Sequence, residues 1–149
     1  MKSLYLSEPQ KNIIESYNEN KSPLVIWGSV GCGKTTLAKH LLSETKMTII
    51  DSTHLRLHKE IDDLLDNLNR RNITLMFHSV VEKRGLLVDD LHLYYHEDKK
   101  TYNRLISEGL QKRSHVNVIY TCNKSMMSHR KFTTNPWNHL HLKRTPSLY

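Results

Sequence analysis

One stretch of the sequence combines closely spaced glycines with a lysine and two threonines. Residues 28–36 read GSVGCGKTT and match the pattern G-x-x-x-x-G-K-[ST]. Glycines let the backbone turn tightly, so that successive N–H groups point inward at phosphate oxygens. A helix that starts directly after such a loop adds the positive end of its dipole. The stretch therefore predicts a binding loop for a nucleoside triphosphate, and we expect ATP with Mg²⁺.

The polar side chains of this loop have distinct expected roles. Lys34 would bring its positive charge to the β- and γ-phosphates and assist catalysis, and Thr35 would offer its hydroxyl to the metal ion. Cys32 is expected to serve as a small residue, with a redox or alkylation switch as the alternative. The residues expected to bind the nucleotide are Gly28, Ser29, Val30, Gly31, Cys32, Gly33, Lys34, Thr35 and Thr36.

The segments on either side of the loop fit this prediction. Residues 24–27 are apolar without interruption, as a strand buried on both faces requires. After the loop, apolar residues recur at helical spacing through residue 42. This context disfavours the alternative of an ordinary glycine loop between a strand and a helix.

A second apolar run ends in two carboxylates. Residues 86–88 are Leu-Leu-Val, and Asp89 and Asp90 follow them. Asp89 comes 55 positions after Lys34, which leaves room for a helix, a strand and another helix between them. We assign Asp89 to the magnesium ion and Asp90 to polarising the attacking water. A strand end capped by an acidic turn is the structural alternative.

A third predicted strand, residues 116–121, leads into the polar sequence Thr121-Cys122-Asn123. Either Thr121 or Asn123 could orient water or contact the γ-phosphate, and we place Asn123 with Lys34 and Asp90 among the catalytic residues. An asparagine after a strand is also common in turns.

The remaining segments predict an α/β fold, because short apolar runs alternate with longer periodic stretches. Ser7 and Gln10 form a capping-box pattern at the start of a first helix, which residues 18–22 should end. Gln10 could also read an adenine edge. The further strands are expected at residues 47–51, 86–90, 116–121 and 137–142. The further helices are expected at residues 57–69 and after Asp98, with a short one at 125–131; residues 72–84 are ambiguous, and a helix ending at Gly85 is favoured.

The composition limits the class of protein. The chain has 149 residues, a net charge of +7 and a pI near 9.4, which suggests one domain. It has no apolar run of the ~18–20 residues that a membrane helix needs. Two cysteines and no signal-like N-terminus lead us to expect a soluble intracellular protein, cytoplasmic or nuclear and not secreted. Scattered basic doublets fit either contacts to DNA phosphates or a solvated surface.

The ten histidines give weaker signals. His92 and His96 lie four residues apart, and His139 and His141 flank Leu140. Neither pair is accompanied by a cysteine pair or an H-E-x-x-H pattern. Surface or packing roles are therefore expected for them rather than zinc binding.

The order of these parts resembles the AAA+ ATPases, above all the clamp-loader, replication-initiator and helicase-loader branch. GSVGCGKTT is similar to that family's Walker A loop, LLVDD to its Walker B strand and TCN to its sensor-1 tip. The resemblance spans residues 6–146. It implies a three-layer α/β/α P-loop NTPase with a five-stranded parallel sheet in the order 5-1-4-3-2. It also implies ATP hydrolysis with Mg²⁺, work on DNA in replication or repair, and assembly with AAA+ partner subunits or further copies.

Two parts of the family pattern are missing from the sequence. The arginine finger usually precedes the fifth strand, but residues 134–137 are Thr-Asn-Pro-Trp, and Arg130 and Arg113 are the nearest substitutes. The helical lid usually follows that strand, and we expect residues 1–149 to form a single domain without it. The missing arginine and the missing lid both argue against efficient hydrolysis and against conventional ring assembly.

Three other functions remain open. The sequence LSEPQ before the loop resembles superfamily-one helicases, although Leu91-His92 replaces the expected acid-glutamine pair. A small nucleotide kinase fits the length but would need an arginine-rich lid. An ATP-dependent binding module with little hydrolysis fits the missing finger and lid, with ATP acting as a switch.

Overall fold

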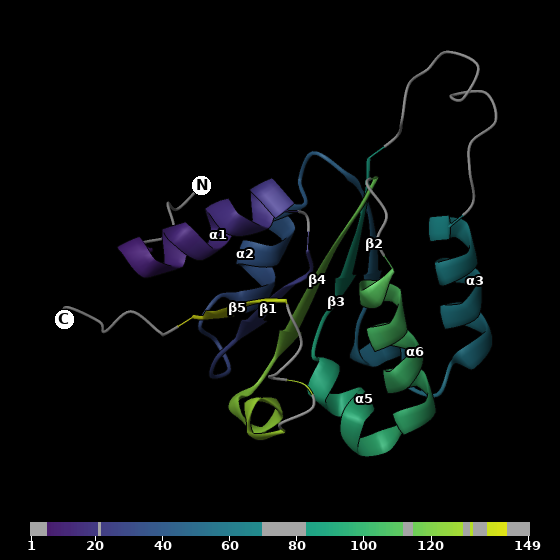
Figure 1. Ribbon diagram of the computed structural model, residues 1–149. Helices are drawn as coiled ribbons and strands as arrows, with labels where there is room; N and C mark the ends of the chain where they lie inside the picture. The colour runs from purple at the N-terminus through teal and green to yellow at the C-terminus, as the bar shows by residue number, and fades with distance from the viewer. Residues whose placement is uncertain are drawn as a thin grey trace, which may run out of the picture.

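A computed structural model describes residues 6–20, 22–69, 83–111, 115–129, 132 and 137–142. Its centre is a five-stranded parallel sheet with the order β2-β3-β4-β1-β5 (Figure 1). This is the predicted order 5-1-4-3-2 read from the opposite edge. The strands are β1 (Leu24–Trp27), β2 (Lys46–Ile50), β3 (Arg84–Val88), β4 (Val116–Cys122) and β5 (Asn138–His141).

Helices cover both faces of the sheet, which gives the expected three layers (Figure 1). α1 (Glu8–Asn20) and α2 (Lys34–Leu41) lie on one face, and α3 (His58–Asn69), α5 (Leu91–Glu97) and α6 (Lys99–Leu110) lie on the other. Two short 3₁₀ helices, η1 (Ser52–His54) and η2 (Lys124–Ser128), follow β2 and β4. None of the described helices is both long and apolar enough to cross a membrane.

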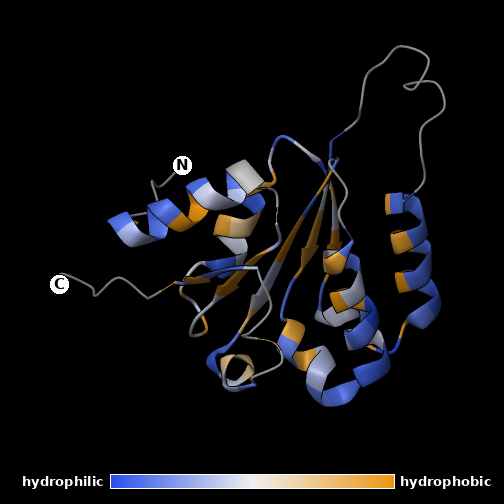
Figure 2. Cartoon of the chain, viewed as in Figure 1, coloured by the Kyte–Doolittle hydropathy of each residue, from blue (hydrophilic) through white to orange (hydrophobic). Residues whose placement is uncertain are grey.

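The alternating side chains of the strands divide the core into two clusters. On β1, Leu24 and Ile26 pack with Leu37 of α2, whereas Val25 packs in the cluster that contains Leu65 of α3. All these side chains are buried. Figure 2 shows the same division, with apolar residues on the strands and on the helix faces turned towards them. A strand buried on both faces needs this continuous apolar sequence, as predicted for β1.

The capping box at the start of α1 is confirmed. The Ser7 N–H donates to Gln10 Oε1 at 2.9 Å, and the Gln10 N–H donates to Ser7 Oγ at 3.4 Å. Gln10 Nε2 also donates to the His141 carbonyl oxygen at 2.8 Å, which ties α1 to β5. Both ends of the Gln10 amide are therefore engaged within the protein, where the sequence left adenine recognition open.

Several predicted boundaries need correction. Gly85 does not end a helix, because it lies within β3; most of the ambiguous segment 72–84 lies outside the described residues. A Cβ at Gly85 would come 2.4 Å from Thr45 Oγ1, so close packing explains the glycine. α1 ends at Asn20, within the expected break at residues 18–22, whereas α5 was not predicted at all. The segment expected as a short helix near residue 125 is the 3₁₀ helix η2.

Candidate nucleotide-binding site

The carboxyl ends of three neighbouring strands bring the predicted motifs to one edge of the sheet. Trp27 at the end of β1 is in register with Cys122 at the end of β4, and Val88 at the end of β3 is in register with Tyr120. The segments that follow these strands therefore leave the sheet side by side. Ligands of open α/β sheets bind at this edge, where loops from neighbouring strands diverge.

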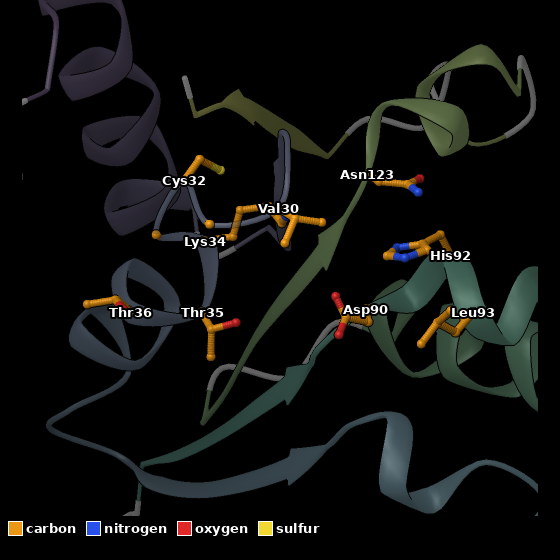
Figure 3. A pocket seen from close by; sticks show the side chains of 11 residues that line it. Val30, Cys32, Lys34, Thr35, Thr36, Asp90, His92, Leu93 and Asn123 are labelled. Carbon is orange, nitrogen blue, oxygen red and sulfur yellow. The ribbon is translucent and has the colours of Figure 1, made fainter. Parts of the chain in front are cut away.

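A cavity of about 550 Å³ lies between these segments (Figure 3). Figure 3 shows Lys34 and Thr35 on one side of it, and Asp90, His92 and Asn123 on the other. The cavity is lined by Val30, Gly31, Cys32, Gly33, Lys34, Thr35, Thr36, Asp90, His92, Leu93 and Asn123. Gly28, Ser29 and Asp89 of the predicted set do not line the cavity; they support the residues that do.

Two glycines of the loop are required by its geometry. Gly33 has φ 93°, a left-handed conformation that side-chain-bearing residues rarely adopt. A Cβ at Gly28 would come 2.2 Å from the Leu142 carbonyl oxygen. The loop can therefore make its tight turn between β1 and α2 only with glycine at these positions.

Lys34 stands in the first turn of α2 and reaches back over the loop. Its Nζ donates to the carbonyl oxygens of Gly28 at 2.8 Å and of Ser29 at 3.2 Å. The side chain is 9% exposed, so the ammonium group is held at the cavity wall and little screened by bulk water. A phosphate group in the cavity would meet this charge together with the N-terminal end of α2.

Thr35 and Asp89 meet beneath the loop. Thr35 Oγ1 donates to Asp89 Oδ1 at 2.8 Å. Thr121 Oγ1 donates to the same oxygen at 2.6 Å and accepts from the Asp90 N–H at 2.9 Å. Thr121 is fully buried. Its hydroxyl therefore fixes both the Asp89 carboxylate and the backbone of the following turn.

The oxygen atoms of Thr35 and Asp89 fit the chemistry of Mg²⁺. This ion prefers oxygen ligands and is usually held by one or two protein groups together with substrate phosphates and water. Among the described residues no group of three or more His, Cys, Asp or Glu side chains could hold a metal ion by itself. The pair is thus suited to a magnesium ion that arrives with a phosphate ligand.

Asp90 begins α5 in an unusual backbone conformation. Its φ and ψ are 57° and 51°, in the left-handed region, where aspartate is among the better tolerated residues. This turn brings the Asp90 carboxylate to the cavity (Figure 3). Burial raises the pKa of Asp90 above its ordinary value, and the neighbouring Asp89 carboxylate raises it further. A carboxylate with a raised pKa is a stronger base than an ordinary aspartate.

The structure separates the two polar candidates that follow β4. Thr121 points to Asp89 and is not in the cavity lining, whereas Asn123 lines the cavity. The Ser125 hydroxyl donates to Asn123 Oδ1 at 2.5 Å. With its oxygen engaged in this way, the Asn123 amide can present its N–H groups to a ligand.

Sequence reasoning missed two residues of the cavity wall, His92 and Leu93 of α5. The only sequence signal for them was their position directly after the acidic pair. Burial lowers the pKa of His92, and the nearby Asp90 carboxylate partly opposes this effect. Arg113 and Arg130, the substitutes considered for an arginine finger, lie outside the described residues.

Comparison with known proteins supports the assignment of the fold. No curated protein sequence matches the chain. A chain from a structural study of katanin self-assembly superposes with a TM-score of 0.62 at 15% identity, over 95% of this chain and 51% of that one. C. elegans PCH-2 superposes with a TM-score of 0.59 at 14% identity, over 94% of this chain and 42% of that one. The chain thus spans about half the length of these AAA+ ATPases or less.

A family model described as the Sigma-54 interaction domain matches residues 3–135, nearly the whole chain. This family is one of AAA+ domains, in agreement with the two structural neighbours and with the strand order. The chain therefore belongs to the Sigma-54 interaction domain family of AAA+ domains.

Proposed function

We propose that this protein binds Mg-ATP in the cavity at the carboxyl edge of the sheet and hydrolyses it to ADP and phosphate. The observation that carries the proposal is the 2.8 Å contact between Thr35 Oγ1 and Asp89 Oδ1, directly beside Lys34. It joins the end of the glycine loop to the end of β3, as a shared magnesium ligand pair requires. The predicted roles of Gly28–Thr36, Asp89, Asp90 and Asn123 are retained in this proposal.

The loop would hold the phosphates. Its backbone N–H groups face the bound phosphates, and the Lys34 ammonium exchanges its contacts with Gly28 and Ser29 for contacts with phosphate oxygens. Magnesium, when bound, would neutralise charge that develops on these oxygens during transfer. Thr35 and Asp89 are the residues placed to hold it, and Thr121 keeps the Asp89 carboxylate oriented.

The opposite wall would carry the chemical step. Asp90 accepts a hydrogen bond from a water molecule, whose oxygen attacks the γ-phosphorus while the bond to the β–γ bridging oxygen breaks. The water proton passes to the carboxylate and then to solvent, which leaves ADP and inorganic phosphate. Asn123 would donate a hydrogen bond to the terminal phosphate or orient the water.

We propose that a second chain completes the site. Residues 134–137 supply no arginine before β5, so the cation that stabilises the transition state would come from a neighbouring copy or partner subunit. Hydrolysis per molecule should then rise with protein concentration. An ATP-dependent binding module remains the second candidate, favoured by the same absence of arginine from residues 134–137.

We propose DNA as the partner of this protein, as in the initiator and loader branch of the AAA+ ATPases. Its support is the Leu86–Asp90 sequence, in which the second acid is aspartate, and the net charge of +7. The name of the matched family points instead to sigma-54 as a partner. Binding to duplex and single-stranded DNA, measured over a salt series, tests the DNA proposal: affinity should fall steeply with salt.

The experiment that tests the function measures phosphate release by the purified protein with Mg-ATP, alone and with DNA, over a range of protein concentrations. Turnover that rises with protein concentration supports an ATPase completed in trans. Saturable binding without turnover under all conditions supports the binding module. Phosphorylation of an added nucleoside monophosphate would instead identify a kinase.

A further inference from the structure

His92 occupies the cavity wall opposite the glycine loop. It lies in the first turn of α5, two residues after Asp90, and lines the cavity together with Asn123 (Figure 3). The core-facing residues of α5 are Leu91 and Tyr94, so the packing of the helix does not require a histidine at position 92. The proposed hydrolysis uses Asp90 and Asn123 on this wall and does not require His92.

The imidazole ring of His92 has an unmet hydrogen-bonding capacity. Its Nδ1 is buried and has no hydrogen-bond partner among the residues that the structure describes. A buried polar atom without a partner costs free energy, and native proteins rarely leave one unpaired without a reason. Because Nδ1 is buried, the ring nitrogen that a ligand in the cavity can reach is Nε2, and no contact within the described protein fixes one tautomer of the ring.

The charges around His92 indicate what kind of ligand this is. Burial and the Lys34 ammonium favour the neutral ring, as does His96, whereas the carboxylates of Asp90 and Asp89 oppose this preference. A neutral imidazole has one donor and one acceptor nitrogen. Anionic oxygens held by Lys34 across the cavity would provide an acceptor for that donor. A triphosphate presents such oxygens farther from the nucleoside than a diphosphate does.

We propose that His92 donates a hydrogen bond to the terminal phosphate of ATP and makes the site prefer ATP over ADP. The proposal rests on the proposed function, since it assumes that the triphosphate lies along the glycine loop. The wall formed by Asp90, His92 and Asn123 would then distinguish ATP from ADP as well as take part in hydrolysis. His92 is thus a specificity-determining residue.

The test compares the affinities of ATPγS and ADP, each with Mg²⁺, by isothermal titration calorimetry. His92→Phe keeps a planar ring and removes both nitrogens, and His92→Gln keeps a hydrogen-bond donor. His96→Phe is the matched control, because His96 lies one turn further along α5 and is exposed. Hydrogen bonds to charged groups typically contribute enough to change an affinity about tenfold or more.

We expect His92→Phe to weaken ATPγS binding about tenfold and to leave ADP binding unchanged. His92→Gln should recover most of this loss, and His96→Phe should bind both nucleotides like the unaltered protein. Equal weakening of both nucleotides by His92→Phe, or no weakening, would overturn the proposal. If the Phe variant does not fold, as judged by thermal denaturation, His92→Ala takes its place with the same expectations.

A measurement on the unaltered protein separates this inference from the proposed function. The ring ¹⁵N resonances of His92 should shift on addition of Mg-ATPγS and much less with Mg-ADP. Nucleotide binding without any difference between the two shifts overturns the role of His92 alone. Absence of binding for both nucleotides overturns the proposed function, and the role of His92 with it.

Discussion

Thr121 and Asp89 lie 32 positions apart in the sequence, and the Thr121 hydroxyl donates a 2.6 Å hydrogen bond to the Asp89 carboxylate. The same hydroxyl accepts the Asp90 N–H, so a single buried side chain on β4 organises both acids that follow β3. From α2, the Thr35 hydroxyl donates to the same oxygen of Asp89. The candidate metal ligand is therefore positioned by two neighbouring elements.

Replacing Thr121 with valine should loosen this arrangement. Valine keeps the shape of the side chain but leaves the Asp90 N–H and one Asp89 oxygen without the hydroxyl, which should cost about 1–3 kcal/mol of folding stability. Urea denaturation measures this loss. Thr48→Val on β2 is the control, because the Thr48 hydroxyl makes no hydrogen bond with a described residue. Equal stability of the two variants would contradict the role assigned to Thr121.

Lys34→Ala should abolish nucleotide binding or nearly so, with a loss on the order of 100-fold in affinity. The reason is that the variant removes the buried ammonium group at the phosphate-binding wall. Titration with a fluorescent ATP analogue measures the change. Lys39→Ala, on an exposed position of the same helix, should bind normally. Retained affinity in Lys34→Ala would show that the phosphates do not lie along this loop.

Asp90→Asn should spare binding and stop hydrolysis. The amide fills the same space but cannot accept the water proton, and loss of a positioned general base typically lowers kcat 10²–10⁴-fold, so a drop of at least about 100-fold is expected. Phosphate-release kinetics measure it beside ATP affinity. Asp63→Asn, on the exposed side of α3, controls for the change of charge. Normal turnover in Asp90→Asn would show that the assigned role is wrong.

Asp90→Asn should also be more stable than the unaltered protein at neutral pH. The pKa of Asp90 is raised in the folded state, so its ionisation opposes folding. This penalty is absent below the ordinary pKa of 3.8 and fully present above the raised value. Asparagine tolerates the left-handed backbone as well as aspartate does. We therefore expect Asp90→Asn to raise the melting temperature on the order of 2 °C at pH 7.

Melting curves at pH 7 and near pH 3 make this comparison. The gain should disappear at the lower pH, where the Asp90 carboxyl is protonated in both the folded and the unfolded chain. A gain of equal size at both values would mean that the charge is not its cause. Asp63→Asn should show no gain at either pH, because that carboxylate is exposed.

Much of the fold could be predicted because its signals are local. The apolar runs at residues 24–27, 86–88 and 116–121 predicted three of the strands, and the glycine loop fixed the position of α2. The strand order came from the family resemblance, since no local pattern encodes which strands are neighbours. Gly85 was misread because a glycine after a periodic stretch is typical of a helix end, whereas here it makes room for Thr45.

The parts of the site that escaped prediction depend on tertiary contacts. α5 has seven residues, too few to show a helical period, so His92 could not be placed on the cavity wall. The choice between Thr121 and Asn123 was open because both follow the same strand. The structure gives them different surroundings, since Thr121 is buried against Asp89 whereas Asn123 lines the cavity.

Equilibrium binding of Mg-ATP to the purified protein tests the central claim most directly. Isothermal titration calorimetry should give one saturable site per chain, and removal of Mg²⁺ with a chelator should weaken it because Thr35 and Asp89 would lose their shared ion. A protein that is folded by circular dichroism but takes up no ATP in the presence of Mg²⁺ would contradict the assignment of this cavity.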